Sequence, residues 1–152
     1  MDETLSWRMS TWIAASPQQV WDALTDAEAT ARFWQHHNVS DWQVGSVWEH
    51  RRLGDGAVDC HGVVREAVPG ERLGFTFEDP AADPAADDAP LVTITLIGGD
   101  GVTQVDLVHV GLRSVDERDS IEFGWQAVFA NLKTMLETGE PLPVFPWEVH
   151  AG

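Results

Sequence analysis

Length, composition and charge already exclude several classes of protein. The chain has 152 residues, and its 25 Asp and Glu residues outnumber nine Lys and Arg residues, which gives a formal net charge of −16 at pH 7. Proteins that bind nucleic acid or anionic lipid need clustered cations, and only Arg51 and Arg52 are adjacent here. The length suits a single domain, 1–152. We therefore expect a one-domain acidic protein that binds no nucleic acid.

Residue types that are rare or missing indicate the compartment. The single cysteine, Cys60, cannot form an internal disulfide, and the acidic residues 1–4 lack the basic start of a signal peptide. The most apolar stretch, 91–97, is far shorter than the roughly 20 residues that span a bilayer. We expect a cytoplasmic protein without membrane insertion. Eight Trp and six Phe without any Tyr indicate large, flat apolar surfaces in the fold.

The first part of the chain predicts a strand followed by two short helices. Apolar residues alternate with polar ones over 5–13, which is typical of a half-buried strand. Ser16, with Pro directly after it and Gln three residues later, is a typical helix start. A second capping signal at 25–28 predicts another short helix that ends at about residue 33 or 34.

From residue 42 onward the sequence changes to short β runs between turn signals, which predicts an antiparallel meander. The predicted strands span 44–53, 57–67, 72–78, 91–97 and 103–111. Alternation turns one side chain in two toward the interior. The predicted inward set is Trp48, His50, Cys60, Gly62, Val64, Leu73, Phe75, Phe77, Val92, Ile94, Leu96, Val105, Leu107 and His109.

A low-complexity segment, 79–90, joins two of these strands and is rich in Asp, Pro and Ala. We interpret it as a solvated, mobile loop, with a flexible lid or a cation site as the alternative. A long helix is predicted over 119–138, with Gly139 as its stop signal. The proline-rich tail, 140–152, is predicted to lack regular structure.

The order of elements predicts an α+β fold, in which a curved antiparallel sheet of six strands wraps around one long C-terminal helix and the body spans about 5–139. Trp125, Phe129, Leu132 and Leu136 share one face of that helix, which must lie on an apolar surface. A curved sheet and one helix do not always fill the space between them. A cavity lined by aromatic side chains is therefore a natural small-molecule site.

Short motifs in a fixed order carry a resemblance to one superfamily. They are 20–25 with Phe33 and Trp34, 44–46, 62–66 with Pro69, 72–77, 103–107 with His109 and Gly111, and Gly124 and Trp125 with Leu132. The chain resembles the helix-grip (START-like, SRPBCC, Bet v-like) superfamily, and within it the homologues of the C-terminal domain of the activator of the heat-shock protein 90 ATPase. The resemblance implies the helix-grip fold. It also implies a range of roles: lipid or polyketide carriage, aromatase or cyclase activity, stress-related binding and chaperone activation.

Two histidines are candidates for acid–base chemistry. His109 and, with weaker register, His50 would point into the cavity, where an imidazole can orient a ligand or transfer a proton. A hydrogen-bonded core histidine is the alternative for each. The adjacent His36 and His37, with Asp41, could ligate a metal, but neighbouring histidines point apart, and a solvated helix terminus is favoured. We expect neither a metal nor a cofactor.

The predicted cavity lining combines aromatic side chains with two histidines and a buried cysteine. It comprises Trp34, Trp48, His50, Cys60, Phe75, Phe77, His109, Trp125 and Phe129. Core packing explains any one of them, but eight tryptophans suit a flat apolar ligand. We expect a monomer or weak homodimer that binds a small hydrophobic or aromatic molecule without catalysis. The alternatives are a cyclase, aromatase or small lyase that uses a cavity histidine, and a chaperone-associated or stress-related interaction protein.

Overall fold

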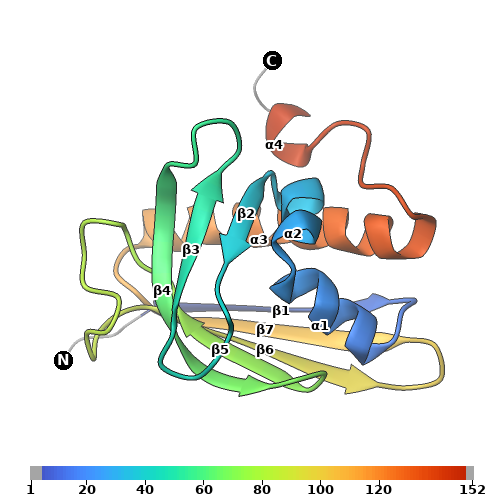
Figure 1. Ribbon diagram of the computed structural model, residues 1–152, viewed down its shortest axis with the longest axis horizontal. Helices are drawn as coiled ribbons and strands as arrows, with labels where there is room; N and C mark the ends of the chain where they lie inside the picture. Colours follow the sequence, from blue (N-terminus) through green and yellow to red (C-terminus); the bar gives the residue numbers. More distant parts are fainter. Residues whose placement is uncertain (1–4, 150–152) are drawn as a thin grey trace.

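One seven-stranded antiparallel sheet and four helices form the part of the chain that this computed structural model describes, residues 5–149 (Figure 1). In chain order the elements are β1 (Leu5–Ile13), α1 (Pro17–Thr25), α2 (Ala27–Trp34), β2 (His36–Val39), β3 (Val47–Arg52), β4 (Val58–Val68), β5 (Arg72–Thr76), β6 (Leu91–Gly98), β7 (Thr103–Leu112), α3 (Val115–Thr138) and α4 (Pro146–Val149). The strand order is β1-β7-β6-β5-β4-β3-β2, so the first and last strands of the chain are neighbours. The sheet curves around α3, which confirms the predicted helix-grip architecture.

The sheet has seven strands where the sequence predicted six, because β2 adds one edge strand. Gln35 ends α2 in the left-handed conformation with φ of 59°, which reverses the chain. Residues 36–39 then pair with β3, with His36 opposite Arg52 and Val39 opposite Glu49. The interpretation of His36 and His37 as a solvated helix terminus was therefore wrong. Their polar, four-residue run carries too little apolar alternation to indicate a strand.

Local capping signals determine where the helices begin. The Ser16 side chain accepts the backbone N–H of Gln19, and the Gln19 side chain accepts that of Ser16, which completes the predicted capping box before α1. The long helix α3 begins at Val115, four residues before the predicted start, because Ser114 caps it by accepting the N–H of Glu117. Gly139 ends α3 with φ of 92°, as predicted.

The proline-rich tail contains one helical turn, α4, where no regular structure was predicted. Its Pro146 stands at the first helical position, where its missing N–H has no intrahelical partner to lose. In Figure 1 the tail turns back along α3 and brings α4 close to β2. Phe145 and Trp147 stack on each other with ring centroids 4.9 Å apart. The tail therefore packs onto the body.

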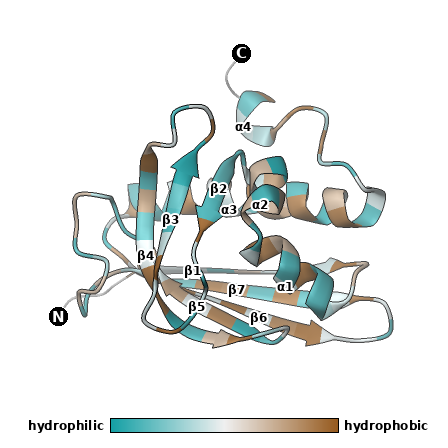
Figure 2. Cartoon of the chain, in the orientation of Figure 1, coloured by the Kyte–Doolittle hydropathy of each residue, from teal (hydrophilic) through white to brown (hydrophobic). Residues whose placement is uncertain are grey.

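The core lies between the sheet and α3. Every side chain of the predicted inward set is buried except Phe77, which is half-buried. Figure 2 shows the hydrophobic residues concentrated on β5, β6 and β7, while β2 and β3 are mainly hydrophilic. One close approach fixes how β3 lies on its neighbours. The indole of Trp48 crosses β4 over Gly62 and donates to the Thr76 carbonyl at 2.8 Å.

The Asp-, Pro- and Ala-rich loop, 79–90, is attached to the sheet through its own backbone carbonyls. His61 contacts the Ala82 carbonyl at 2.9 Å, Arg65 donates to that of Ala85, and the Thr76 hydroxyl donates to that of Pro84. Ala89, at the end of the loop, is buried. These contacts hold the loop beside β4 and β5.

Candidate functional site

A pocket of about 300 Å³ lies between the sheet and α3, and we call it the aromatic pocket. Its volume is at the lower end of the roughly 300–1,000 Å³ typical of small-molecule sites. Its walls are mainly aromatic and aliphatic. They are formed by Trp34, Gln35, His36, Phe77, Ser120, Ile121, Gly124, Trp125, Val128 and Trp147.

Helix α3 supplies one wall of the aromatic pocket because Ile121, Trp125 and Val128 recur at helical spacing. Trp125 makes edge contacts with Trp34, the last residue of α2, at a centroid distance of 5.2 Å. Gly124 lies on the same wall, and a Cβ added there would meet no atom within 4 Å outside its own helix turn. The open volume therefore exists partly because position 124 has no side chain.

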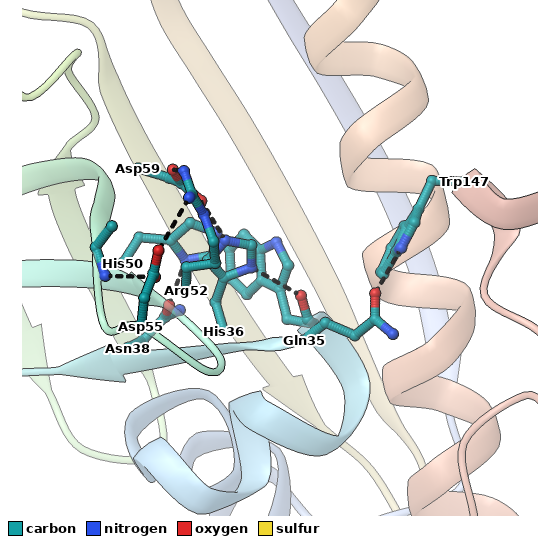
Figure 3. A network of polar contacts seen from close by, with 10 residues as sticks. Gln35, His36, Asn38, His50, Arg52, Asp55, Asp59 and Trp147 are labelled. Carbon is teal, nitrogen blue, oxygen red and sulfur yellow. Dashed lines mark hydrogen bonds and ion pairs between the residues drawn. The ribbon is translucent and has the colours of Figure 1, made fainter. Parts of the chain in front are cut away.

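The C-terminal tail supplies another wall of the pocket through Trp147. Its indole N–H donates to the Gln35 amide oxygen at 2.7 Å (Figure 3). The buried Asn131 of α3 holds the start of the tail: its oxygen accepts the Leu142 N–H at 3.2 Å and its NH₂ donates to the Phe33 carbonyl. These bonds position the tail across one side of the pocket.

A polar network flanks the aromatic pocket on β2, β3 and β4 (Figure 3). Asp59 accepts from Arg52 at 2.6 Å and pairs with the His36 ring at 2.8 Å. These hydrogen bonds lower the pKa of Asp59 to about 2, Arg52 contributing most. The rings of His36 and His50 stack with centroids 3.8 Å apart, and His50 Nδ1 contacts the Asn38 side chain. Burial, and secondarily the charge of His36, lowers the pKa of His50 to about 3.

A second hollow, of about 410 Å³, adjoins the aromatic pocket, and we call it the polar hollow. It is lined by Asp59, Cys60, Phe77, Glu78, Asp79, His109, Arg113, Glu117, Ser120 and Ile121. Phe77, Ser120 and Ile121 line both hollows, so one wall is continuous between them. Arg113 binds the two carboxylate oxygens of the buried Glu78 at 3.0 and 2.9 Å. This bidentate pair lowers the pKa of Glu78.

His109 stands at the end of β7 between the polar hollow and Trp125. It is 0% exposed, and its Nδ1 accepts the indole N–H of Trp125 at 3.1 Å. Burial lowers the pKa of His109 to about 4, so the ring is neutral at pH 7. The ring centroid of Phe77 lies 5.5 Å away. His109 is thus a neutral imidazole within an aromatic environment.

The nine residues predicted to line one cavity lie in three places. Trp34, Phe77 and Trp125 line the aromatic pocket, and Cys60, Phe77 and His109 line the polar hollow. The others, Trp48, His50, Phe75 and Phe129, are buried in the core beside these hollows.

Some lining residues were not among the sequence predictions. Trp147 and Gln35 depend on the return of the tail, which no local pattern indicates. Ser120, Ile121 and Val128 could have been found, because they lie within four residues of Trp125 or Gly124 on the same helical face.

Metal-binding and thiolate sites receive no support within residues 5–149. That region has no group of three or more His, Cys, Asp or Glu side chains that could hold a metal ion. Burial, together with Asp59 and Asp79, raises the pKa of the Cys60 thiol, so it is protonated at pH 7. Within the described residues, no helix is long and apolar enough to cross a membrane.

Comparisons with known proteins establish the family. Residues 14–137 match the family described as activator of Hsp90 ATPase homolog 1-like protein. The chain belongs to this family. A search of curated proteins finds no significant match.

Several solved structures share the fold. The Aha1 dimer of Colwellia psychrerythraea is 20% identical, with a TM-score of 0.73, over 89% of this chain and 98% of that one. An HSP90 activator from Plasmodium falciparum is 18% identical, with a TM-score of 0.72, over 87% and 96%. DynU16, a protein in the dynemicin biosynthetic locus, is 25% identical, with a TM-score of 0.72, over 90% of this chain but 48% of that one.

Proposed function

We propose that the protein binds a small hydrophobic or aromatic molecule in the aromatic pocket, between the sheet and α3. The supporting observation is an apolar pocket of about 300 Å³ with three tryptophans in its walls, Trp34, Trp125 and Trp147. A flat ring can stack on such walls or meet them edge-on, which contributes affinity beyond the area buried. The proposed unit is the body, 5–139, together with the tail that supplies Trp147.

Simple binding is better supported than catalysis by His109. A general base needs a ring nitrogen with a free lone pair within reach of the substrate. The lone pair of His109 Nδ1 accepts the indole N–H of Trp125, and the proton of the neutral ring is then on Nε2. His50 lies in the core, its Nδ1 on Asn38 and its ring stacked on His36. The identities of 20% and 18% to the Aha1 dimer and the HSP90 activator support a common fold and carry no chaperone partner over to this chain.

The experiment is a fluorescence titration with N-phenyl-1-naphthylamine, an uncharged hydrophobic probe whose emission rises in apolar surroundings. We expect saturable binding with energy transfer from the pocket tryptophans. Gly124→Leu would place a side chain in the open volume, since a Cβ at this position meets no atom within 4 Å outside its own helix turn, and should abolish binding while the protein stays folded. Ala130→Leu is the matched control, because Ala130 is exposed on the same helix.

Two results would contradict the proposal. One is the absence of saturable binding by the unmodified protein. The other is equal binding by the unmodified protein and Gly124→Leu, which would place the probe elsewhere on the surface.

A further inference from the structure

The His109 ring, which lies between the sheet and α3, has one buried nitrogen that bears on the polar part of the ligand. Among the described residues, the buried side-chain nitrogens that lack a hydrogen-bond partner are Trp42 Nε1 and His109 Nε2. Of these, His109 is the one that lies beneath α3, in the wall of the polar hollow. A buried polar group without a partner is costly, so this nitrogen indicates where a polar ligand atom would be stabilised. His109 Nε2 is shielded from water, so a ligand atom that reaches it must displace a neighbouring side chain of the hollow wall.

The hydrogen bond from Trp125 to His109 determines whether the ligand atom that meets Nε2 is a hydrogen-bond donor or an acceptor. An indole nitrogen can only donate, so His109 Nδ1 must be the acceptor of the 3.1 Å bond. In a neutral imidazole the single proton then resides on Nε2. Nε2–H is therefore a hydrogen-bond donor, and its missing partner is an acceptor atom.

Charge in the polar hollow restricts the acceptor further. Its walls carry four carboxylates, Asp59, Glu78, Asp79 and Glu117, against one guanidinium, Arg113. Arg113 is already occupied by its bidentate pair with Glu78. An anionic ligand would be repelled here, so a carboxylate is a poor partner for His109 and an uncharged oxygen is a good one.

We propose that the ligand is an uncharged, planar aromatic carbonyl compound, whose oxygen accepts a hydrogen bond from His109 Nε2–H while its rings extend toward the aromatic pocket. The continuous wall of Phe77, Ser120 and Ile121 connects the two hollows along this path. The inference rests on the proposed function, and it adds the chemical class of the ligand and the residue that selects it.

The test compares three probes of similar shape by displacement of N-phenyl-1-naphthylamine: fluorenone, fluorene, which lacks the carbonyl oxygen, and fluorenone-4-carboxylate. We expect fluorenone to bind more tightly than fluorene by about 2- to 10-fold, the range for one neutral hydrogen bond. The carboxylate should bind more weakly than fluorenone. His109→Phe should abolish the preference for fluorenone, and His109→Gln, which retains an N–H donor, should keep it.

Trp125→Phe provides a second variant if His109→Phe does not fold. It removes the indole donor, frees the proton to move between the two ring nitrogens, and should reduce the ratio of fluorenone to fluorene affinity. Nitrogen NMR of the His109 ring in the unmodified protein should show a proton on Nε2 at pH 7. A proton on Nδ1 would overturn the inference.

The outcomes separate this inference from the proposed function. Equal affinity for fluorenone and fluorene, or tighter binding of the carboxylate, would overturn the inference while leaving pocket binding intact. Failure of N-phenyl-1-naphthylamine and all three competitors to bind would overturn both. A preference that survives His109→Phe would show that another residue selects the carbonyl oxygen and would also overturn the inference.

Discussion

Trp147 donates its indole N–H to the side chain of Gln35 at 2.7 Å and so attaches the C-terminal tail to the residue that ends α2. The same Gln35 has a left-handed backbone, with φ of 59°, and lines the aromatic pocket. Gln35 therefore has two structural roles. Its backbone makes the turn into the edge strand β2, and its side chain holds the wall that the tail adds to the pocket.

Trp147→Ala should weaken binding of N-phenyl-1-naphthylamine by roughly 10-fold, because the pocket loses one aromatic wall. Trp147→Phe retains a ring but not the donor, and should have a smaller effect. Fluorescence titration gives the affinities. The control is Trp12→Ala, a substitution of a tryptophan that is 55% exposed and remote from the pocket; an equal loss of affinity in that variant would argue against a specific role for the tail.

Gly62→Ala and Gly124→Ala should have opposite effects on stability. A Cβ at position 62 would lie 1.7 Å from the Thr76 carbonyl oxygen, so the strands must separate, at a cost of about 1–3 kcal/mol or more. Position 124 is helical and open, so alanine there should stabilise the fold by roughly 0.4–1 kcal/mol. Chemical denaturation of the two variants measures both changes, and destabilisation by Gly124→Ala would show that the helix wall is closed at that position.

Arg113→Ala should destabilise the protein by about 1–3 kcal/mol, because it leaves the Glu78 carboxylate, whose side chain is 6% exposed, without its charged partner. Arg8→Ala, on an exposed part of β1, is the matched control. The lowered pKa of Glu78 means that this stabilisation is present at neutral pH and is lost as the pH falls through that pKa. Denaturation should therefore show a difference in the free energy of unfolding between the unmodified protein and Arg113→Ala at pH 7, and a smaller difference at acidic pH.

The buried histidines should make the protein less stable as the pH falls below about 6.5. Burial lowers the pKa of His109 to about 4 and that of His50 to about 3. Between about pH 6.5 and 4 the unfolded chain binds protons at both positions and the folded chain does not. Stability therefore decreases with falling pH, by up to about 1.4 kcal/mol per pH unit for each histidine.

Denaturation of His109→Gln over the same pH range tests this explanation. The variant lacks one of the two titrating groups, so its stability should depend less steeply on pH than that of the unmodified protein. Trp12→Ala, which changes an exposed side chain that carries no titrating group, should retain the full slope. A His109→Gln profile parallel to the unmodified profile would contradict the assigned origin of the pH dependence.

The sequence predicted the strands and helices that have one face in the core and the other face toward solvent. Ile94 and Leu107 are buried and alternate with less buried neighbours, and this two-residue period is visible without a structure. Strand β2 was missed because its pairing depends on the left-handed conformation of Gln35. Non-glycine residues adopt this conformation rarely, so a sequence pattern does not predict it. The early start of α3 was missed although Ser114 and Glu117 form a recognisable cap.

The candidate site was less predictable than the fold, because its walls come from distant segments. Alternation places Phe77 and His109 on the inner face, but cannot show that Phe77 lines two adjoining hollows. The Trp125 to His109 hydrogen bond joins residues 16 apart on different elements, and only the packing of α3 on the sheet specifies it. Trp147 reaches the pocket through a tail whose path local sequence does not encode.

The loop at 79–90 is anchored through backbone carbonyls, which every amino acid possesses, while the anchoring side chains, Thr76, His61 and Arg65, belong to strands. The exposed Asp87 and Asp88 can therefore be exchanged without removing any of these anchors. This separation makes the loop a suitable insertion point for an epitope or a fluorescent label. A reporter placed at Asp87 would lie outside the residues that line the two hollows, whereas Asp79 at the start of the loop belongs to the wall of the polar hollow.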